Sequence, residues 1–207
     1  LLTRALEDDR ALQYLSQVNF PTALTGTCRY DNIIQVDTDN EGAAEKMTTL
    51  LIGKGFRRFA FLVKNMSYNV DRKRHEGFCR ALIKNGISEK DQLFYNGSIR
   101  MEFLDAIIEN IISKKVECII CGDDEICTMV MSRLQAEGYR IPKDVAIASL
   151  YNSTNLDCYS PAVTAVSVAA SQMGGAAVRQ LIQRLRGENY EKKTMLDYDI
   201  LFRKSTN

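Results

Sequence analysis

Two cysteines are spaced so that they could bind a metal ion or undergo thiol–disulfide exchange. Cys118 and Cys121 form the C-x-x-C motif of zinc sites and thiol–disulfide enzymes. The motif lies within residues 116–121, an apolar run that predicts a buried strand. Residues three apart on a strand point to opposite faces of the sheet, so one metal ion could not easily take both thiolates. We therefore predict that both are small core residues, and that the six cysteines of the chain hold no zinc and no structural disulfide.

The other groups that could carry catalysis also favour structural roles. The single histidine, His75, lies among charged residues on a predicted helix, which favours a solvated side chain over a catalytic base. Asp123, Asp124 and Glu125 could hold a cation, but they open a predicted helix, where acidic residues cap free N–H groups. We assign that capping role to Asp124 and leave the role of Asp123 open.

The sequence contains neither a phosphate-binding loop nor a nucleophile elbow. Gly53-Lys54-Gly55 lacks the further glycine of a dinucleotide-binding fingerprint, and it ends a predicted helix where that fingerprint should begin one. We therefore predict that the chain is not an enzyme, has no catalytic residues and uses neither a cofactor nor a metal.

Hydrophobic periodicity predicts helices and strands that alternate along the chain. The predicted helices cover residues 7–17, 41–53, 74–85, 101–113, 124–137 and 171–186, and the predicted strands cover residues 20–26, 59–63, 116–121, 145–150 and 196–203. Glycines follow four of the helices, at Gly55, Gly86, Gly138 and Gly187. Such alternation predicts parallel sheets with right-handed crossovers, in which ligands bind beyond the carboxyl ends of the strands.

Composition limits the classes of function. The 207 residues include 27 Lys and Arg against 26 Asp and Glu, so the totals predict no strongly basic face for a phosphate backbone. Hydrophobic residues make up 45%, and the length allows one domain or two lobes of about 100 residues each. The sequence has neither a membrane-length apolar run nor a secretion signal, and it opens on Leu1-Leu2-Thr3, which is typical of the tail of a strand.

Four stretches, in order, together resemble the LacI/GalR family of bacterial transcription regulators. They are Val36-Asp37-Thr38-Asp39-Asn40 with the helix and basic residues up to Ala60, Arg74-His75-Glu76-Gly77-Phe78-Cys79-Arg80-Ala81-Leu82, Ile119 to Val145, and Ser160 to Thr206 with its final Arg203-Lys204-Ser205-Thr206. The purine-repressor branch is nearest, through Ile120-Cys121-Gly122 and Pro161-Ala162. Each motif alone is weak, but their joint spacing is specific.

The resemblance implies an α/β, periplasmic-binding-protein-like fold of two lobes, each with a parallel sheet flanked by helices. Residues 1–36 and 164–191 would form an N-terminal lobe that is incomplete in this chain. Residues 37–163 and 192–207 would form the C-terminal lobe. The chain would cross between the lobes near residues 35–37, 161–166 and 190–194.

The resemblance also implies a set of ligand-binding residues. Arg74 matches the family's effector-binding arginine, whose guanidinium suits forked hydrogen bonds, although a surface helix arginine is the alternative. Asp39 matches an aspartate that faces the ligand in some relatives, and helix capping is an equal alternative for it. The residues that fall where relatives place the walls of the pocket are Tyr68, Val70 and Ile120.

Two positions depart from the pattern of sugar-binding relatives. Tyr151 stands where the family usually has an aspartate that accepts hydrogen bonds from ligand hydroxyls, and Asp123 stands where many members have asparagine. A phenol in place of a carboxylate removes a charged acceptor and adds a flat face. Both residues are candidate ligand contacts, and a ring-bearing ligand that stacks on Tyr151 becomes an alternative to a plain sugar.

We predict from these observations the effector-sensing and dimerisation domain of a cytoplasmic, repressor-type transcription regulator. It would bind a small sugar-like or ring-bearing molecule between its lobes, pair with a second copy, and reach operator DNA through an N-terminal helix-turn-helix that is not in this chain. One alternative is a periplasmic sugar-binding protein of the same fold. Another is a regulator whose pocket has decayed and which answers to a protein partner.

Overall fold

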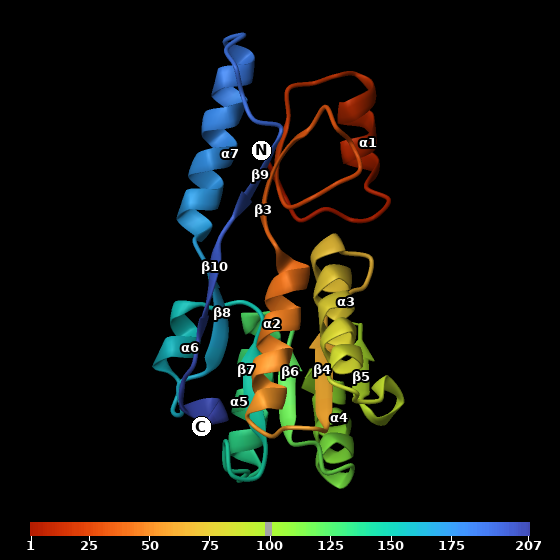
Figure 1. Cartoon of the computed structure of the whole chain (residues 1–207), viewed down its shortest axis with the longest axis vertical. Helices are drawn as coiled ribbons and strands as arrows, with labels where there is room; N and C mark the ends of the chain where they lie inside the picture. The colour runs from red at the N-terminus through yellow and green to blue at the C-terminus, as the bar shows by residue number, and fades with distance from the viewer. Residues whose placement is uncertain (98–100) are drawn as a thin grey trace.

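The computed structural model describes residues 1–97 and 101–207, and it shows two lobes joined along one side (Figure 1). The first lobe is built on a four-stranded parallel sheet of order β1-β2-β3-β9, with helices α1 and α7 against it. Its strands are β1 (Leu2–Thr3), β2 (Ala23–Thr25), β3 (Ile34–Thr38) and β9 (Lys193–Leu196), and its helices are α1 (Arg10–Gln17) and α7 (Ala170–Leu185). The strand predicted at Leu1-Leu2-Thr3 is confirmed.

The second lobe is built on a six-stranded sheet of order β10-β8-β7-β6-β4-β5, in which only the β10–β8 pair is antiparallel. Its strands are β4 (Phe59–Val63), β5 (Leu93–Asn96), β6 (Cys118–Cys121), β7 (Ala146–Ser149), β8 (Thr164–Val168) and β10 (Tyr198–Leu201). Its helices are α2 (Asn40–Gly53), α3 (Asn69–Lys84), α4 (Met101–Ser113), α5 (Asp124–Ala136) and α6 (Thr154–Cys158), with 3-10 turns at Glu89–Asp91 and Lys204–Thr206.

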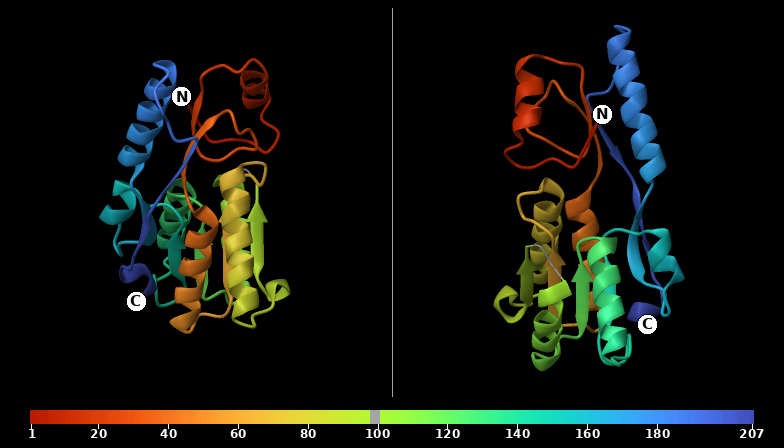
Figure 2. Two further views of the ribbon diagram at one scale, coloured as in Figure 1. Left: turned by 45° about the horizontal axis from the view of Figure 1, so that its top comes forward. Right: turned by 180° about the vertical axis from the view of Figure 1, so that it is seen from behind.

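The core of the second lobe lies on both faces of its sheet. Helices α2 and α3 cover one face and α4 and α5 cover the other, as the two further views in Figure 2 show. Strand β4 serves both layers, because Phe59, Phe61 and Val63 face α2 and α3 while Ala60 and Leu62 face α4 and α5. The continuous apolar run predicted as a strand buried on both faces is therefore confirmed.

Most predicted elements are found, with some shifted bounds. Helix α2 and helix α3 end before Gly55 and Gly86, whose φ angles of 105° and 67° are the left-handed conformations that glycine tolerates. Helix α3 begins at Asn69, about a turn earlier than predicted. The last predicted strand, over residues 196–203, is instead two strands in two different sheets, β9 and β10.

The chain crosses between the sheets three times, at β3 to α2, at β8 to α7 and at β9 to β10. These crossings differ by a few residues from the predicted ones. Residues 164–168 were assigned to the first lobe, but β8 pairs with β7 and β10 in the second. Residues 193–196 were assigned to the second lobe, but β9 pairs with β3 in the first. The differences arise because strand partners, which the sequence does not reveal, decide where a strand belongs.

The lobes also touch through a short main-chain contact, which we call the latch and define as residues 5–7 of the first lobe against residues 67–69 of the second. The Glu7 amide donates to the Ser67 carbonyl at 2.9 Å, and the Asn69 amide donates to the Ala5 carbonyl at 3.1 Å. Leu6 and Tyr68 lie between them as an antiparallel bridge. The lobes are thus held by hydrogen bonds in addition to the three crossing segments.

Within residues 1–97 and 101–207, no helix combines the length and the apolar character needed to cross a membrane.

Candidate ligand-binding cleft

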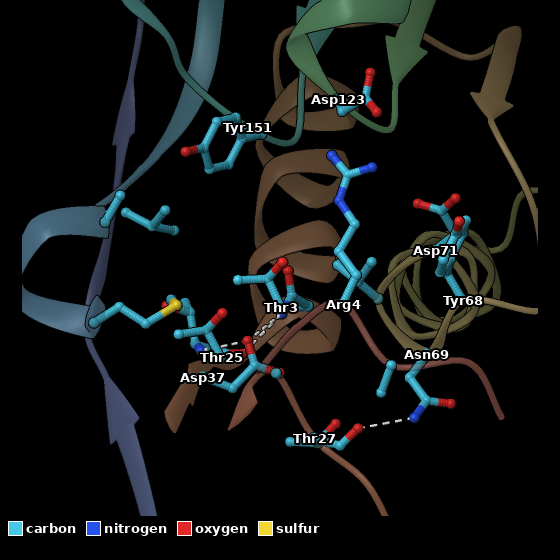
Figure 3. Close-up of a pocket in the computed structure, with 18 of the residues that line it drawn as sticks. Thr3, Arg4, Thr25, Thr27, Asp37, Tyr68, Asn69, Asp71, Asp123 and Tyr151 are labelled. Atoms are coloured by element: carbon cyan, nitrogen blue, oxygen red, sulfur yellow. Dashed lines mark hydrogen bonds between the residues drawn. The ribbon is translucent and has the colours of Figure 1, made fainter. Parts of the chain in front are cut away.

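A cavity of about 450 Å³ opens between the two sheets, within the size range of small-molecule sites. The first lobe contributes the ends of β1, β2 and β3 and the start of α7, and the second contributes the start of α3 and the segments after β4, β6 and β7. Most of these segments lie at the carboxyl ends of parallel strands, where α/β sheets bind ligands. Figure 3 shows polar side chains from both lobes facing one another across it.

Arg74 lines this cleft from α3, and only 7% of it is exposed. Its Nη1 donates to the Gly122 carbonyl at 2.6 Å, which is its one side-chain hydrogen bond among the described residues. Burial lowers the pKa of the guanidinium, while the negative charges of Asp71, Asp123 and Asp37 act to raise it. A guanidinium carries five N–H donors, so Arg74 keeps donors for a ligand.

Two buried carboxylates accompany Arg74 in the cleft, Asp37 at the end of β3 and Asp71 in α3. Asp37 accepts hydrogen bonds from the Thr38 amide at 2.8 Å and from Asn40 Nδ2 at 3.0 Å. Asp71 accepts from the Asn65 amide at 3.0 Å. These hydrogen bonds fix the orientation of each carboxylate within the cleft. Burial raises the pKa of both carboxyl groups, against the opposing effect of the hydrogen bonds.

Asp123 lines the cleft and caps helix α5, with its side chain accepting from the Ile126 amide at 2.9 Å. The prediction that Asp124 is the cap is wrong, because the extended backbone of Asp123 turns its carboxylate back over the helix end. Asp124 is instead the first residue of the helix. Asp123 also pairs with Lys64 Nζ at 3.0 Å, and Lys64 pairs with Glu125 as well, so the two carboxylates share one cation.

Three of the remaining predicted site residues line the cleft, namely Tyr68, Val70 and Tyr151. Tyr151 follows β7, and its main chain is fixed by Ser149 Oγ, which donates to the Tyr151 carbonyl at 2.7 Å. Its phenol lies on the wall formed by the second lobe (Figure 3).

Asp39 and Ile120 are corrections, because neither lines the cleft. Asp39 caps α2, accepting from the Gly42 amide at 2.9 Å, and so takes the capping role that was its alternative. Ile120 is completely buried, since its place in β6 turns it into the core beneath α2 and α3. The structure thus brings together five of the seven predicted residues, Arg74, Tyr68, Val70, Asp123 and Tyr151.

Sequence reasoning missed several charged and polar residues of the cleft. Arg4 follows β1 with a φ of 60°, and Asn69 donates from Nδ2 to the Thr27 carbonyl of the other lobe at 2.8 Å. The missed residues that carry the arguments below are Arg4, Asp37, Lys64, Asn69 and Asp71. Nothing in their spacing distinguishes them from solvated residues, because the fold brings them together from segments far apart in the chain.

The alternation predicted for the C-x-x-C motif is confirmed. Cys118 packs with the cluster under α2 and α3, whereas Cys121 packs with the cluster under α4 and α5, and burial raises the pKa of both thiols. The expectation of a solvated His75 is wrong. Its ring is half-buried, and the ring centroid lies 4.3 Å from the centroid of Phe94 and 5.8 Å from the centroid of Phe61.

Two lobes built on parallel or mostly parallel sheets are joined by three crossings and enclose a ligand-sized cleft at the strand ends. These features define a periplasmic-binding-protein-like domain. The family model described as a periplasmic binding protein-like domain matches residues 48–206. The chain belongs to this family, and its relatives place it among the LacI-type transcription regulators.

Three comparisons illustrate the relationship. The HTH-type transcriptional regulator CelR of Thermobifida fusca is 26% identical over 211 residues, which cover 99% of this chain and 62% of that protein. A crystal structure of a LacI transcriptional regulator from Bacillus cereus subsp. cytotoxis is 30% identical, with a TM-score of 0.88, over 99% of this chain and 74% of that one. A complex of CelR with cellobiose is 25% identical, with a TM-score of 0.86, over 99% of this chain and 64% of that one. The chain thus spans under two thirds of CelR.

Proposed function

We propose that the chain is the effector-sensing part of a repressor-type transcription regulator, and that its cleft binds a small polar molecule. The observation that carries this proposal is Arg74, an arginine that is buried at the junction of the lobes and keeps unused N–H donors facing the cleft. Burying a guanidinium with unused donors is costly unless a partner completes its hydrogen bonds. A bound ligand would supply those partners.

The proposal extends to the whole protein. It would act in the cytoplasm as a homodimer, and a helix-turn-helix domain outside this chain would read operator DNA. The curated relatives that support this are HTH-type regulators such as CelR. Ligand binding would change how the two lobes meet, and so the spacing of the paired DNA-binding domains. Regulators of this kind bind ligands without transforming them, so we propose no enzymatic activity.

The ligand would be sugar-like or ring-bearing. The complex of CelR with cellobiose favours a sugar, and the Thr, Asn and Asp side chains that line this cleft suit hydroxyl groups. Tyr151 favours a ligand with a flat or ring face, since it offers an aromatic surface where a carboxylate would have offered charged acceptors.

The test is ligand binding to the intact protein before and after removal of Arg74. Calorimetry with compounds found in a thermal-shift screen should show that Arg74→Ala lowers affinity about 10- to 150-fold, the effect of losing a charge-assisted hydrogen bond of roughly 1.5–3 kcal/mol. Arg80→Ala is the matched control, because Arg80 is an exposed residue of the same helix that lies outside the cleft and pairs with Glu41 and Glu45 of α2. Equal affinity in the Arg74 variant and the wild type would contradict the proposal.

A further inference from the structure

Arg4 of the first lobe places its own positive charge in the cleft. Its side chain extends from the end of β1 toward the space between Tyr151 and Asp123 on the opposite wall (Figure 3). Its main chain is anchored on both sides, since the Arg4 amide donates to the Thr25 carbonyl at 3.4 Å and the next carbonyl, of Ala5, accepts from the Asn69 amide. The position of Arg4 is therefore set by the fold at the point where the lobes meet.

Arg4 is exposed and forms no salt bridge with the described residues, unlike its cationic neighbours. Burial raises the pKa of Asp71, and the charge of Arg4 acts to lower it from a longer distance. Lys64 pairs with Asp123 at 3.0 Å and also with Glu125, and Arg72 pairs with Glu76. Within residues 1–97 and 101–207, no carboxylate oxygen lies within 4.0 Å of a side-chain nitrogen of Arg4. Burial is the main cause that lowers the pKa of Arg74, and the charge of Arg4 lowers it further, against the opposing charges of Asp71, Asp123 and Asp37. The two guanidinium groups therefore repel each other across the cleft. An anion between them would relieve that repulsion.

The carboxylates of the cleft are, in contrast, already engaged. Asp123 pairs with Lys64, which it shares with Glu125, and it caps the start of α5. Asp37 and Asp71 are buried and accept hydrogen bonds from neighbouring N–H groups. The position that would place a further carboxylate on the wall near Arg4 holds the phenol of Tyr151, which does not repel an anion.

We propose that the ligand of this cleft carries a single carboxylate, as sugar acids do, and that Arg4 binds that group, which rests on the proposed function of the cleft. A guanidinium binds a carboxylate through two parallel N–H···O bonds, so the acid end of the ligand would be both held and oriented. Its hydroxyl groups would then face the Asp, Asn and Thr side chains of the cleft. A doubly charged phosphate is disfavoured relative to a single carboxylate, because Asp37 and Asp71 in the same cavity repel the larger charge more strongly.

The experiment compares acids with their neutral counterparts on the intact protein. The probes are D-glucuronate, D-galacturonate and D-gluconate against D-glucose and D-galactose, with glucose 6-phosphate as the phosphate arm, each titrated by calorimetry. The variants are Arg4→Gln and, as the matched control, Arg10→Gln, since Arg10 is an exposed residue of α1 outside the cleft. We expect at least one acid to bind more tightly than its neutral counterpart, and Arg4→Gln to lower that affinity about 10-fold or more. Arg10→Gln should leave it unchanged.

Several outcomes would overturn the proposal: a neutral hexose that binds as tightly as its acid, an acid bound equally by Arg4→Gln, binding of the phosphate alone, or no binding by any acid of the set. The first of these, with binding that still needs Arg74, would leave the proposed function standing while this inference fails. Acid binding that depends on Arg4 but not on Arg74 would count against the role proposed for Arg74 alone.

Discussion

The two lobes bury apolar side chains to very different extents. The second lobe has large clusters on both faces of its sheet, and Phe59 and Phe61 of β4 contact Phe78 of α3 within one of them. The first lobe has two small clusters of short or aliphatic residues, around Ile34 and around Leu24. Since stabilisation grows with the apolar area removed from water, the second lobe should provide most of the stability and the first should adapt more readily.

The largest effect should come from the aromatic core of the second lobe. Phe61 is completely buried, and its ring stacks on Phe78 with centroids 4.7 Å apart. Phe61→Ala should lower the free energy of unfolding by about 3–5 kcal/mol, through lost burial and the cavity left behind. Urea unfolding followed by circular dichroism would measure this, with Phe61→Leu as a milder control. A loss smaller than that of a comparable truncation in the first lobe would break the comparison.

That comparable truncation is Leu24→Ala. Leu24 is completely buried in the first lobe, but among the described residues the other buried members of its cluster are just Ala5, Leu12 and Ile33. We expect a loss of about 2 kcal/mol, at the low end of the range for such truncations, because a small cluster can close around the gap. The same urea unfolding measures it, with Leu24→Met as the volume-conserving control. A loss equal to that of Phe61→Ala would show that the lobes contribute alike.

A smaller effect should follow from loosening the contact between the lobes. Asn69→Ala removes the side-chain hydrogen bond to the Thr27 carbonyl and should cost about 1 kcal/mol. Asn85→Ala is the matched control, because it removes one side-chain hydrogen bond, to the Ala81 carbonyl, within the same helix region of a single lobe. Small-angle scattering should show a larger radius of gyration for Asn69→Ala only. Identical radii for the two variants would show that Asn69 does not restrain the lobes.

The smallest effect concerns pH and belongs to the second lobe alone. Burial lowers the pKa of His75 below its usual 6.5, against the opposing charges of Glu89 and Glu76. Below pH 6.5 the unfolded chain then binds a proton that the folded chain does not, so stability falls as the pH decreases through that region. His75→Gln should flatten this part of the profile measured by thermal unfolding. An unchanged slope in the variant would mean that other groups cause it.

The contrast between the two apolar cores also explains which helices and strands could be predicted from the sequence. Strand β4 and helix α4 were predicted with their observed bounds, because a continuous apolar run and a strong helical period each specify one element. In the first lobe β3 was not predicted as a strand, since its polar residues Gln35, Asp37 and Thr38 are buried by tertiary contacts that leave no local pattern.

The cleft was predictable only where the resemblance supplied a position. Arg74 and Tyr151 were found in this way, whereas Arg4 and Lys64 were missed because side chains converge there from strands whose order the sequence does not state. Asp39 and Ile120 show the reverse error. Asp39 adjoins two cleft residues and Ile120 lies three residues before another, but helix capping and strand alternation turn their side chains away.

The latch is made of main-chain atoms, with Glu7 donating to Ser67 and Asn69 donating to Ala5. Such hydrogen bonds do not depend on which side chains the residues carry, as long as none is proline. Substitutions accumulating in the cleft during evolution can therefore change its ligand while the main-chain contact between the lobes is kept. The separation of recognition from mechanical coupling offers a physical reason why one architecture can acquire new specificities without losing its response.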